Sequence, residues 1–111
     1  MVAAALRRRA LTEFVTHLRR ALGTNLVDVR LFGSEARGDA SPESDIDVLV
    51  VVQPDEARIP FEDRIIDLAF DVNVEFGVYI SPRVVTPGIL SHPIWGTTPF
   101  LVNVRRDSVP L

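Results

Sequence analysis

The sequence of 111 residues contains no cysteine, no lysine and no apolar stretch long enough to cross a bilayer. Without cysteine the chain can form neither a disulfide nor a thiolate metal site, and it has no thiol nucleophile. Without lysine it cannot use Schiff-base chemistry or the lysine of a P-loop. A membrane span needs about 20 consecutive apolar residues. These absences exclude several enzyme classes, and we expect no contact with a membrane.

The charge balance also lacks an excess of basic residues. The net charge is −3, and all twelve basic residues are arginines. A weakly acidic chain without a basic face in its sequence argues against nucleic acid as the main partner. The first residues, "MVAAALRRRALTEF", faintly resemble an organellar transit peptide. They do not resemble a secretory signal, because their arginines follow the apolar residues instead of preceding them. We interpret them as an amphipathic helix of a cytoplasmic protein.

Apolar residues make up 47% of the chain, and their spacing predicts an α/β domain that covers residues 1–111. Helices follow an apolar period of three to four residues, and strands follow alternating or continuous apolar residues. The predicted elements are a helix at 3–22, strands at 26–32 and 45–53, a helix at 60–76, a strand at 78–85, and short helical turns in the proline-rich tail, one of them near 99–106.

Three details of these elements can be tested by a structure. The run "VLVVV" at 48–52 is typical of a central strand covered on both faces. Pro82 indicates an edge or a bulge in the last predicted strand. The arginines at 7–9 are interpreted as part of the solvated face of the first helix.

A pair of carboxylates opens the second predicted strand. Asp45 and Asp47 are two residues apart, so on a strand both side chains point to the same face, about 7 Å apart. Ile46 and Val48 then point into the core and fix the backbone that aims the acids. Two carboxylates held in this way can share a hard divalent cation such as Mg²⁺. Alone, such a pair is more often a solvated strand end.

A turn with anion-binding features precedes these acids. Gly33 and Ser34 follow directly on a strand, where a glycine allows close backbone approach and a serine offers N–H and hydroxyl donors. Arg37 can meet a phosphate charge, and Gly38 lets the chain turn away. A metal site and an anion cradle on neighbouring strands are what nucleotidyl transfer requires.

Together, "GSEARGDASPESDIDVLV" resembles the signature of the nucleotidyltransferase superfamily that includes DNA polymerase β, and more closely that of its minimal members. The resemblance implies a small mixed sheet with helices packed on it, and Mg²⁺-dependent transfer of a nucleoside monophosphate, AMP in the first instance, from NTP to an acceptor. It places Gly33, Ser34 and Arg37 at the nucleotide, and makes Asp45 and Asp47 the catalytic metal ligands. Such domains are commonly paired with a helical HEPN-domain protein, as the antitoxin of a toxin pair.

The sequence departs from this signature at the third carboxylate, which serves the family as general base. Tyr79 occupies the expected position, and Ser81 shares its face. Either the acceptor or a partner supplies the missing group, or the domain binds a partner protein without catalysis. Transfer to a small molecule is a third hypothesis, but the chain has little room for a second acceptor-binding domain. The acceptor, the base preference and the oligomeric state, whether homo- or hetero-oligomer, stay open.

Overall fold

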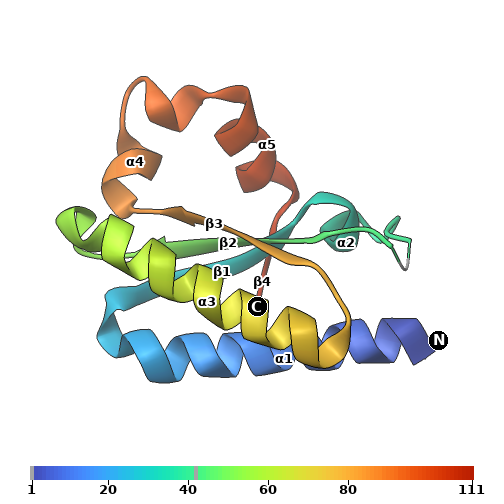
Figure 1. The fold of residues 1–111 in the computed structure, drawn as a ribbon. Helices are drawn as coiled ribbons and strands as arrows, with labels where there is room; N and C mark the ends of the chain where they lie inside the picture. Colours follow the sequence, from blue (N-terminus) through green and yellow to red (C-terminus); the bar gives the residue numbers. More distant parts are fainter. Residues whose placement is uncertain (1, 42) are drawn as a thin grey trace.

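A computed structural model describes residues 2–41 and 43–111 of the chain. Helices and strands alternate from α1 to α4, and a further helix and a short strand follow (Figure 1). In chain order the elements are α1 (Val2–Leu22), β1 (Leu26–Phe32), α2 (Gly33–Arg37), β2 (Ile46–Val52), α3 (Arg58–Phe76), β3 (Ile80–Val85), α4 (Pro87–Ser91), α5 (Pro99–Asp107) and β4 (Val109–Pro110). Short 3-10 turns lie at residues 23–25, 55–57 and 95–97.

The four strands form one mixed sheet in the order β3-β2-β1-β4. β2 pairs antiparallel with β1, so that Phe32 lies opposite Asp47. β2 also pairs parallel with β3, so that Asp47 lies opposite Ser81. The end of β1 and the starts of β2 and β3 therefore meet at one end of the sheet. This is where α2 and the predicted site residues are found (Figure 1).

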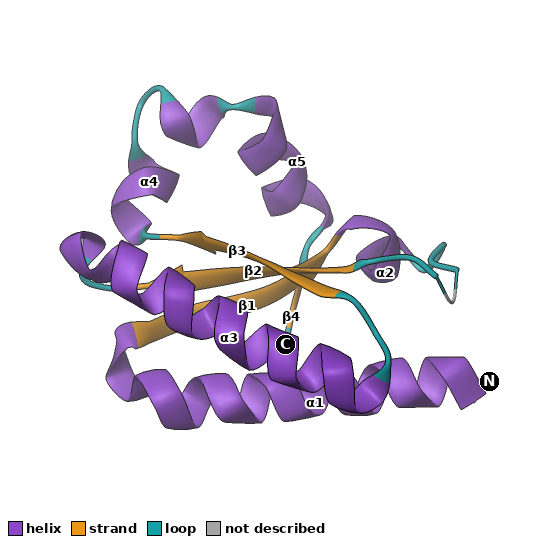
Figure 2. Cartoon of the chain, viewed as in Figure 1, coloured by secondary structure: helices purple, strands orange, loops and turns teal. Residues whose placement is uncertain are grey.

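Helices cover both faces of the sheet. α1 and α3 pack side by side on one face, and α4 and α5 lie on the other (Figure 2). Alternate residues of β2 point into the two layers: Val48 and Val50 are fully buried with α1 and α3, while Leu49 and Val51 belong to the cluster beneath α4 and α5. Since the acids at 45 and 47 share the face of Leu49, they lie on the α5 side.

The predicted α/β fold with a small mixed sheet is confirmed, and the predicted elements differ from the observed ones by a few residues at their ends. β2 is buried on both faces, and β3 with Pro82 is an edge strand, as the sequence predicts. The tail contains one element that the sequence did not predict. This is the short strand β4, which pairs with β1. Its two residues are too few for an alternating pattern.

One prediction about the first helix is wrong. Arg8 and Arg9 are exposed, but Arg7 is only 6% exposed and does not belong to a solvated face. The N-terminal part of α1 extends under α2 (Figure 1). Arg7 is buried because its guanidinium binds Glu35 in α2 and the carbonyl oxygen of Ser44 in the loop before β2. In the described part of the chain, no helix combines the length and apolarity of a membrane-crossing segment.

Candidate active site

The predicted site residues converge from two neighbouring strands. Gly33 and Ser34 begin α2 directly after β1, and Asp47 lies in β2 opposite the last residue of β1. Asp45 is exposed and stands two residues earlier, just before β2 begins. The structure therefore brings the glycine-serine turn and the carboxylate pair to the same end of the sheet.

Gly33 is the point of closest approach between these two parts. Its φ of +73° lies in the left-handed region, which lets the chain reverse from β1 into α2. A Cβ atom at this position would collide with Oδ2 of Asp47 and lie 3.2 Å from its Cγ. A side chain here is therefore excluded twice, by the backbone conformation and by the Asp47 carboxylate.

The electrostatics of Asp47 differ from those of an ordinary surface acid. Burial raises the pKa of Asp47, and the neighbouring charge of Asp45 raises it further. The positive charges of Arg83 and Arg37 act in the opposite direction and lower the same pKa. A carboxylate pair that repels itself, with arginines nearby, favours the arrival of a cation between the acids and of an anion beside the arginines.

Arg37 lies at the end of α2 and is exposed. It is paired with Asp39, at 3.5 Å between Nε and Oδ2. Its positive charge lowers the pKa of Asp47, and its role in binding a phosphate stays a prediction. Arg83 was not predicted. Because β3 is parallel to β2, Arg83 falls on the same face as Asp47 and Ser81, and this depends on a strand register that the sequence does not reveal.

Position 79, where the sequence resemblance predicts a third carboxylate, carries a tyrosine. Ser81 lies directly opposite Asp47, and Tyr79, whose carbonyl oxygen accepts a hydrogen bond from the N–H of Ile46, precedes β3 and is 69% exposed. Among the described residues no group of three or more His, Cys, Asp or Glu side chains could hold a metal. The site offers two carboxylates.

The donor set of Asp45 and Asp47 fits one hard divalent cation. Both groups are oxygen ligands, and Mg²⁺ is commonly held by one or two carboxylates while phosphate oxygens and water complete its coordination. The absence of a Cβ at Gly33 lets the Asp47 carboxylate lie directly against the start of α2. The mutual repulsion that raises the pKa of Asp47 would be relieved by such a cation.

Helix α5 in the tail lines one side of a hollow beside the Gly33–Ser34 turn. A hollow of about 110 Å³ lies between α2 and α5, and its lining residues are Phe32, Gly33, Arg37, Phe100, Asn103, Val104 and Asp107. Phe32 and Phe100 meet edge to face with ring centroids 5.6 Å apart. Pockets for small molecules usually have roughly 300–1,000 Å³, so this hollow is too small for a whole nucleotide. We assign it to the packing of α5 against the site.

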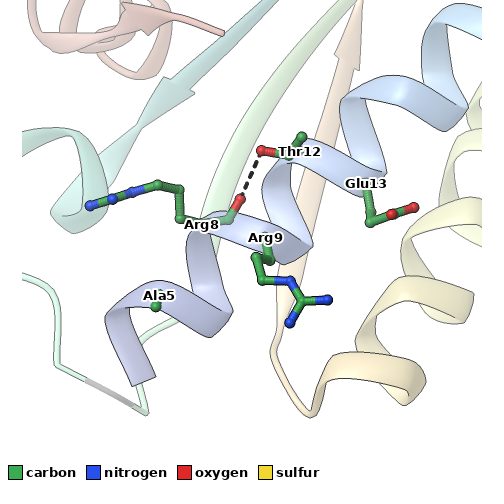
Figure 3. A pocket seen from close by; sticks show the side chains of 5 residues that line it. All are labelled: Ala5, Arg8, Arg9, Thr12 and Glu13. Atoms are coloured by element: carbon green, nitrogen blue, oxygen red, sulfur yellow. Dashed lines mark hydrogen bonds between the residues drawn. The ribbon is translucent and has the colours of Figure 1, made fainter. Parts of the chain in front are cut away.

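A second hollow, of about 360 Å³, lies along the outer face of α1. Its lining residues are Ala5, Arg8, Arg9, Thr12 and Glu13, and Figure 3 shows the side chains of Arg8 and Arg9 pointing away from each other. None of the predicted site residues lines it. The guanidinium of Arg9 instead lies over the ring of Phe76 in α3, 5.8 Å from its centroid.

Comparison with known proteins agrees with this geometry. A family model described as a nucleotidyltransferase domain matches residues 11–108. A candidate protein adenylyltransferase of Methanocaldococcus jannaschii is 35% identical over 82 residues, which cover 73% of this chain but 56% of the relative, so the chain spans just over half of that protein. A second candidate protein adenylyltransferase of the same organism is 35% identical over 86 residues, which cover 78% of this chain and 80% of the relative.

Solved structures show the same fold. A candidate minimal nucleotidyltransferase is 28% identical, with a TM-score of 0.59, and the match covers 98% of this chain and 95% of that one. A chain of a toxin-antitoxin structure with AMP-PNP is 19% identical, with a TM-score of 0.50 and coverage of 87% and 68%, and this likeness concerns the fold alone. Because the family model spans nearly the whole sequence, the chain belongs to the nucleotidyltransferase domain family.

Proposed function

We propose that the chain transfers the AMP group of ATP to a hydroxyl group on a partner protein. The observation that carries this proposal is the meeting of the Gly33–Ser34 turn with the start of β2 at Asp45 and Asp47, where the missing side chain of Gly33 lets the Asp47 carboxylate lie directly against the turn. The choice of AMP and of a protein acceptor is supported by the two relatives named as candidate protein adenylyltransferases.

In this proposal Asp45 and Asp47 hold one Mg²⁺ ion. Bound there, the ion would supply positive charge to the triphosphate and polarise the phosphorus that is attacked. Gly33 and Ser34 bind the phosphates through backbone N–H groups and the serine hydroxyl. Arg37 in α2 and Arg83 in β3, whose charges act on Asp47, add the positive charge that a triphosphate with four negative charges needs.

The reaction forms one bond and breaks one. The hydroxyl oxygen of the acceptor attacks the α-phosphorus of ATP, the bond from that phosphorus to the bridging oxygen of pyrophosphate breaks, and pyrophosphate leaves. The acceptor hydroxyl loses its proton. Since Tyr79 stands where the family resemblance implies the general base, we propose that the acceptor protein brings the proton-accepting group.

We further propose that the acceptor is a helical HEPN-type toxin and that this chain is its antitoxin. The similarity in fold to a chain of a toxin-antitoxin structure with AMP-PNP supports this context. The partner would be encoded beside this chain's gene, and modification by AMP would inactivate it.

Transfer of labelled AMP tests the proposal directly. The chain is incubated with the neighbouring gene product, Mg²⁺ and ATP labelled at the α-phosphate. We expect label on the partner, and we expect the double variant Asp45→Asn/Asp47→Asn to transfer none. If the two proteins associate but no NTP labels the partner, the proposal is wrong.

A second function is supported by the uncharged residues at positions 79 and 81. A site with two carboxylates instead of three holds a second metal ion weakly. The chain would then neutralise its partner by association alone. In that case the double Asp→Asn variant would bind and inhibit the partner as well as the unmodified chain does, whereas the transfer mechanism predicts that this variant fails to protect.

A further inference from the structure

Arg7 is a buried arginine whose partners lie far away in the sequence. Its Nε donates a hydrogen bond of 2.7 Å to Oε1 of Glu35 in α2, and its Nη2 forms an ion pair with the same carboxylate. Nη2 also donates a hydrogen bond of 2.8 Å to the carbonyl oxygen of Ser44. One guanidinium on α1 thus joins two separate segments of the chain.

These two segments are the two halves of the candidate active site. Glu35 follows directly on the Gly33–Ser34 turn, and Ser44 directly precedes Asp45. We infer that Arg7 is a positioning residue, which fixes the phosphate-binding turn and the carboxylate pair against α1 so that they meet. This inference rests on the proposed function of the site, although Arg7 itself touches neither nucleotide nor metal in that proposal.

An arginine suits this position for geometric reasons. Its planar guanidinium presents several donors in a fixed fork, so it can bind a carboxylate and a carbonyl oxygen together, and it stays charged when buried. The Arg7 side chain is 8% exposed and that of Glu35 is 23% exposed. An ion pair shielded in this way holds its geometry better than the exposed pairs on the surface of the chain.

Hydrogen bonds between Ser41 and Ser44 also hold the loop before Asp45. The N–H of Ser41 donates to Oγ of Ser44 at 2.9 Å, and the N–H of Ser44 donates to the carbonyl oxygen of Ser41 at 3.1 Å. These contacts close the loop on itself, but they do not attach it to the rest of the molecule. The bond from Arg7 to Ser44 provides an attachment one residue before Asp45.

The variant Arg7→Lys tests the inference, with Arg8→Lys as matched control because Arg8 is the exposed neighbour on the same helix. A lysine keeps the charge but cannot span both partners. Hydrogen exchange measured by NMR without nucleotide should become faster at residues 34–37 and 44–46 together, while α3 keeps its protection. The affinity for Mg²⁺–AMP-PNP should fall roughly 10- to 100-fold, as for other residues that orient metal ligands. Arg8→Lys should change neither property.

A second variant tests the contact of Arg7 with Glu35 separately from its contact with Ser44. Glu35→Gln keeps an oxygen for Nε but removes the ion pair, so exchange should rise at residues 34–37 and stay unchanged at 44–46. If Arg7→Lys does not fold, this variant still decides the question. The inference is overturned if exchange rises evenly over all elements including α3, or if both segments exchange as in the unmodified chain. If the unmodified chain does not bind Mg²⁺–AMP-PNP, the proposed function fails, while the exchange comparison still tests the role of Arg7.

Discussion

Replacing Gly33 by alanine should separate the two parts of the site. The φ of +73° at this position is unfavourable for an L residue, and the new Cβ would collide with Oδ2 of Asp47. Either the carboxylate turns away or α2 shifts, and both movements take Asp47 out of its present relation to the turn. The variant should therefore lose stability and ligand affinity together.

The size of the effect follows from two contributions. A left-handed conformation costs alanine about 1–2 kcal/mol, and relief of an overpacked contact typically costs a further 1–3 kcal/mol. We therefore expect the free energy of unfolding to fall by about 2–5 kcal/mol. With an unfolding entropy of about 2.1 cal/mol/K per residue, the 111 residues give about 0.23 kcal/mol/K, and Tm should fall by roughly 9–21 °C.

Gly77 provides a matched control for this variant. Its φ is +67°, and a Cβ there would have no neighbour within 4 Å. Gly77→Ala should thus show the backbone contribution alone, a decrease in Tm of about 4–9 °C, with unchanged affinity for Mg²⁺–AMP-PNP. Scanning calorimetry and titration calorimetry measure the two quantities. Equal loss of stability in both variants, with full ligand affinity in Gly33→Ala, would refute the reasoning.

Three further predictions concern the site and its support. Folding raises the pKa of Asp47, so protonation of this carboxyl group favours the folded state. This contribution to the free energy of unfolding is present in full below about pH 4, and it is lost as the pH rises through the pKa that Asp47 has in the folded state. At pH 7 the variant Asp47→Asn should therefore have a higher Tm than the unmodified chain while losing Mg²⁺-dependent binding, and a lower Tm would contradict this account. Ser81→Asp should lower Tm without metal, because it adds a third carboxylate opposite Asp47, and Mg²⁺ should raise Tm more in this variant than in the unmodified chain. An unchanged response to Mg²⁺ would show that position 81 does not face the metal. Thr86 is 1% exposed and caps α4 while its Oγ1 donates to Asp55 at 3.0 Å, so Thr86→Val should cost about 1–2 kcal/mol of stability and leave nucleotide affinity unchanged. A change in affinity would mean that α4 is coupled to the site.

Much of the fold could be predicted because its strongest elements have long, regular patterns. Phe14 and Leu18 on α1 and Ile65 and Ala69 on α3 follow the helical period, and all four are buried. The apolar run of β2 predicts its central place in the sheet, which the structure confirms. In these segments local pattern and tertiary packing agree.

The features that the sequence did not predict all depend on contacts between distant segments. Arg7 has the local pattern of a solvated arginine, and only the position of α2 and Ser44 makes it buried. Arg83 lies on the same face of the sheet as Asp47 because of a strand register that no short motif encodes. β4 forms because Leu111 and its neighbours reach β1, where the N–H of Leu111 donates to Val29. Such features require the assembled sheet.

The central claim is that Gly33–Ser34 and Asp45/Asp47 form one site for a metal ion and a triphosphate. Titration calorimetry with AMP-PNP, with and without Mg²⁺, tests this most directly, because it does not depend on the acceptor. The account predicts binding at one site that requires Mg²⁺ and is abolished in Asp45→Asn/Asp47→Asn. Equal binding by the unmodified chain and the double variant, or no binding by the unmodified chain, would contradict it.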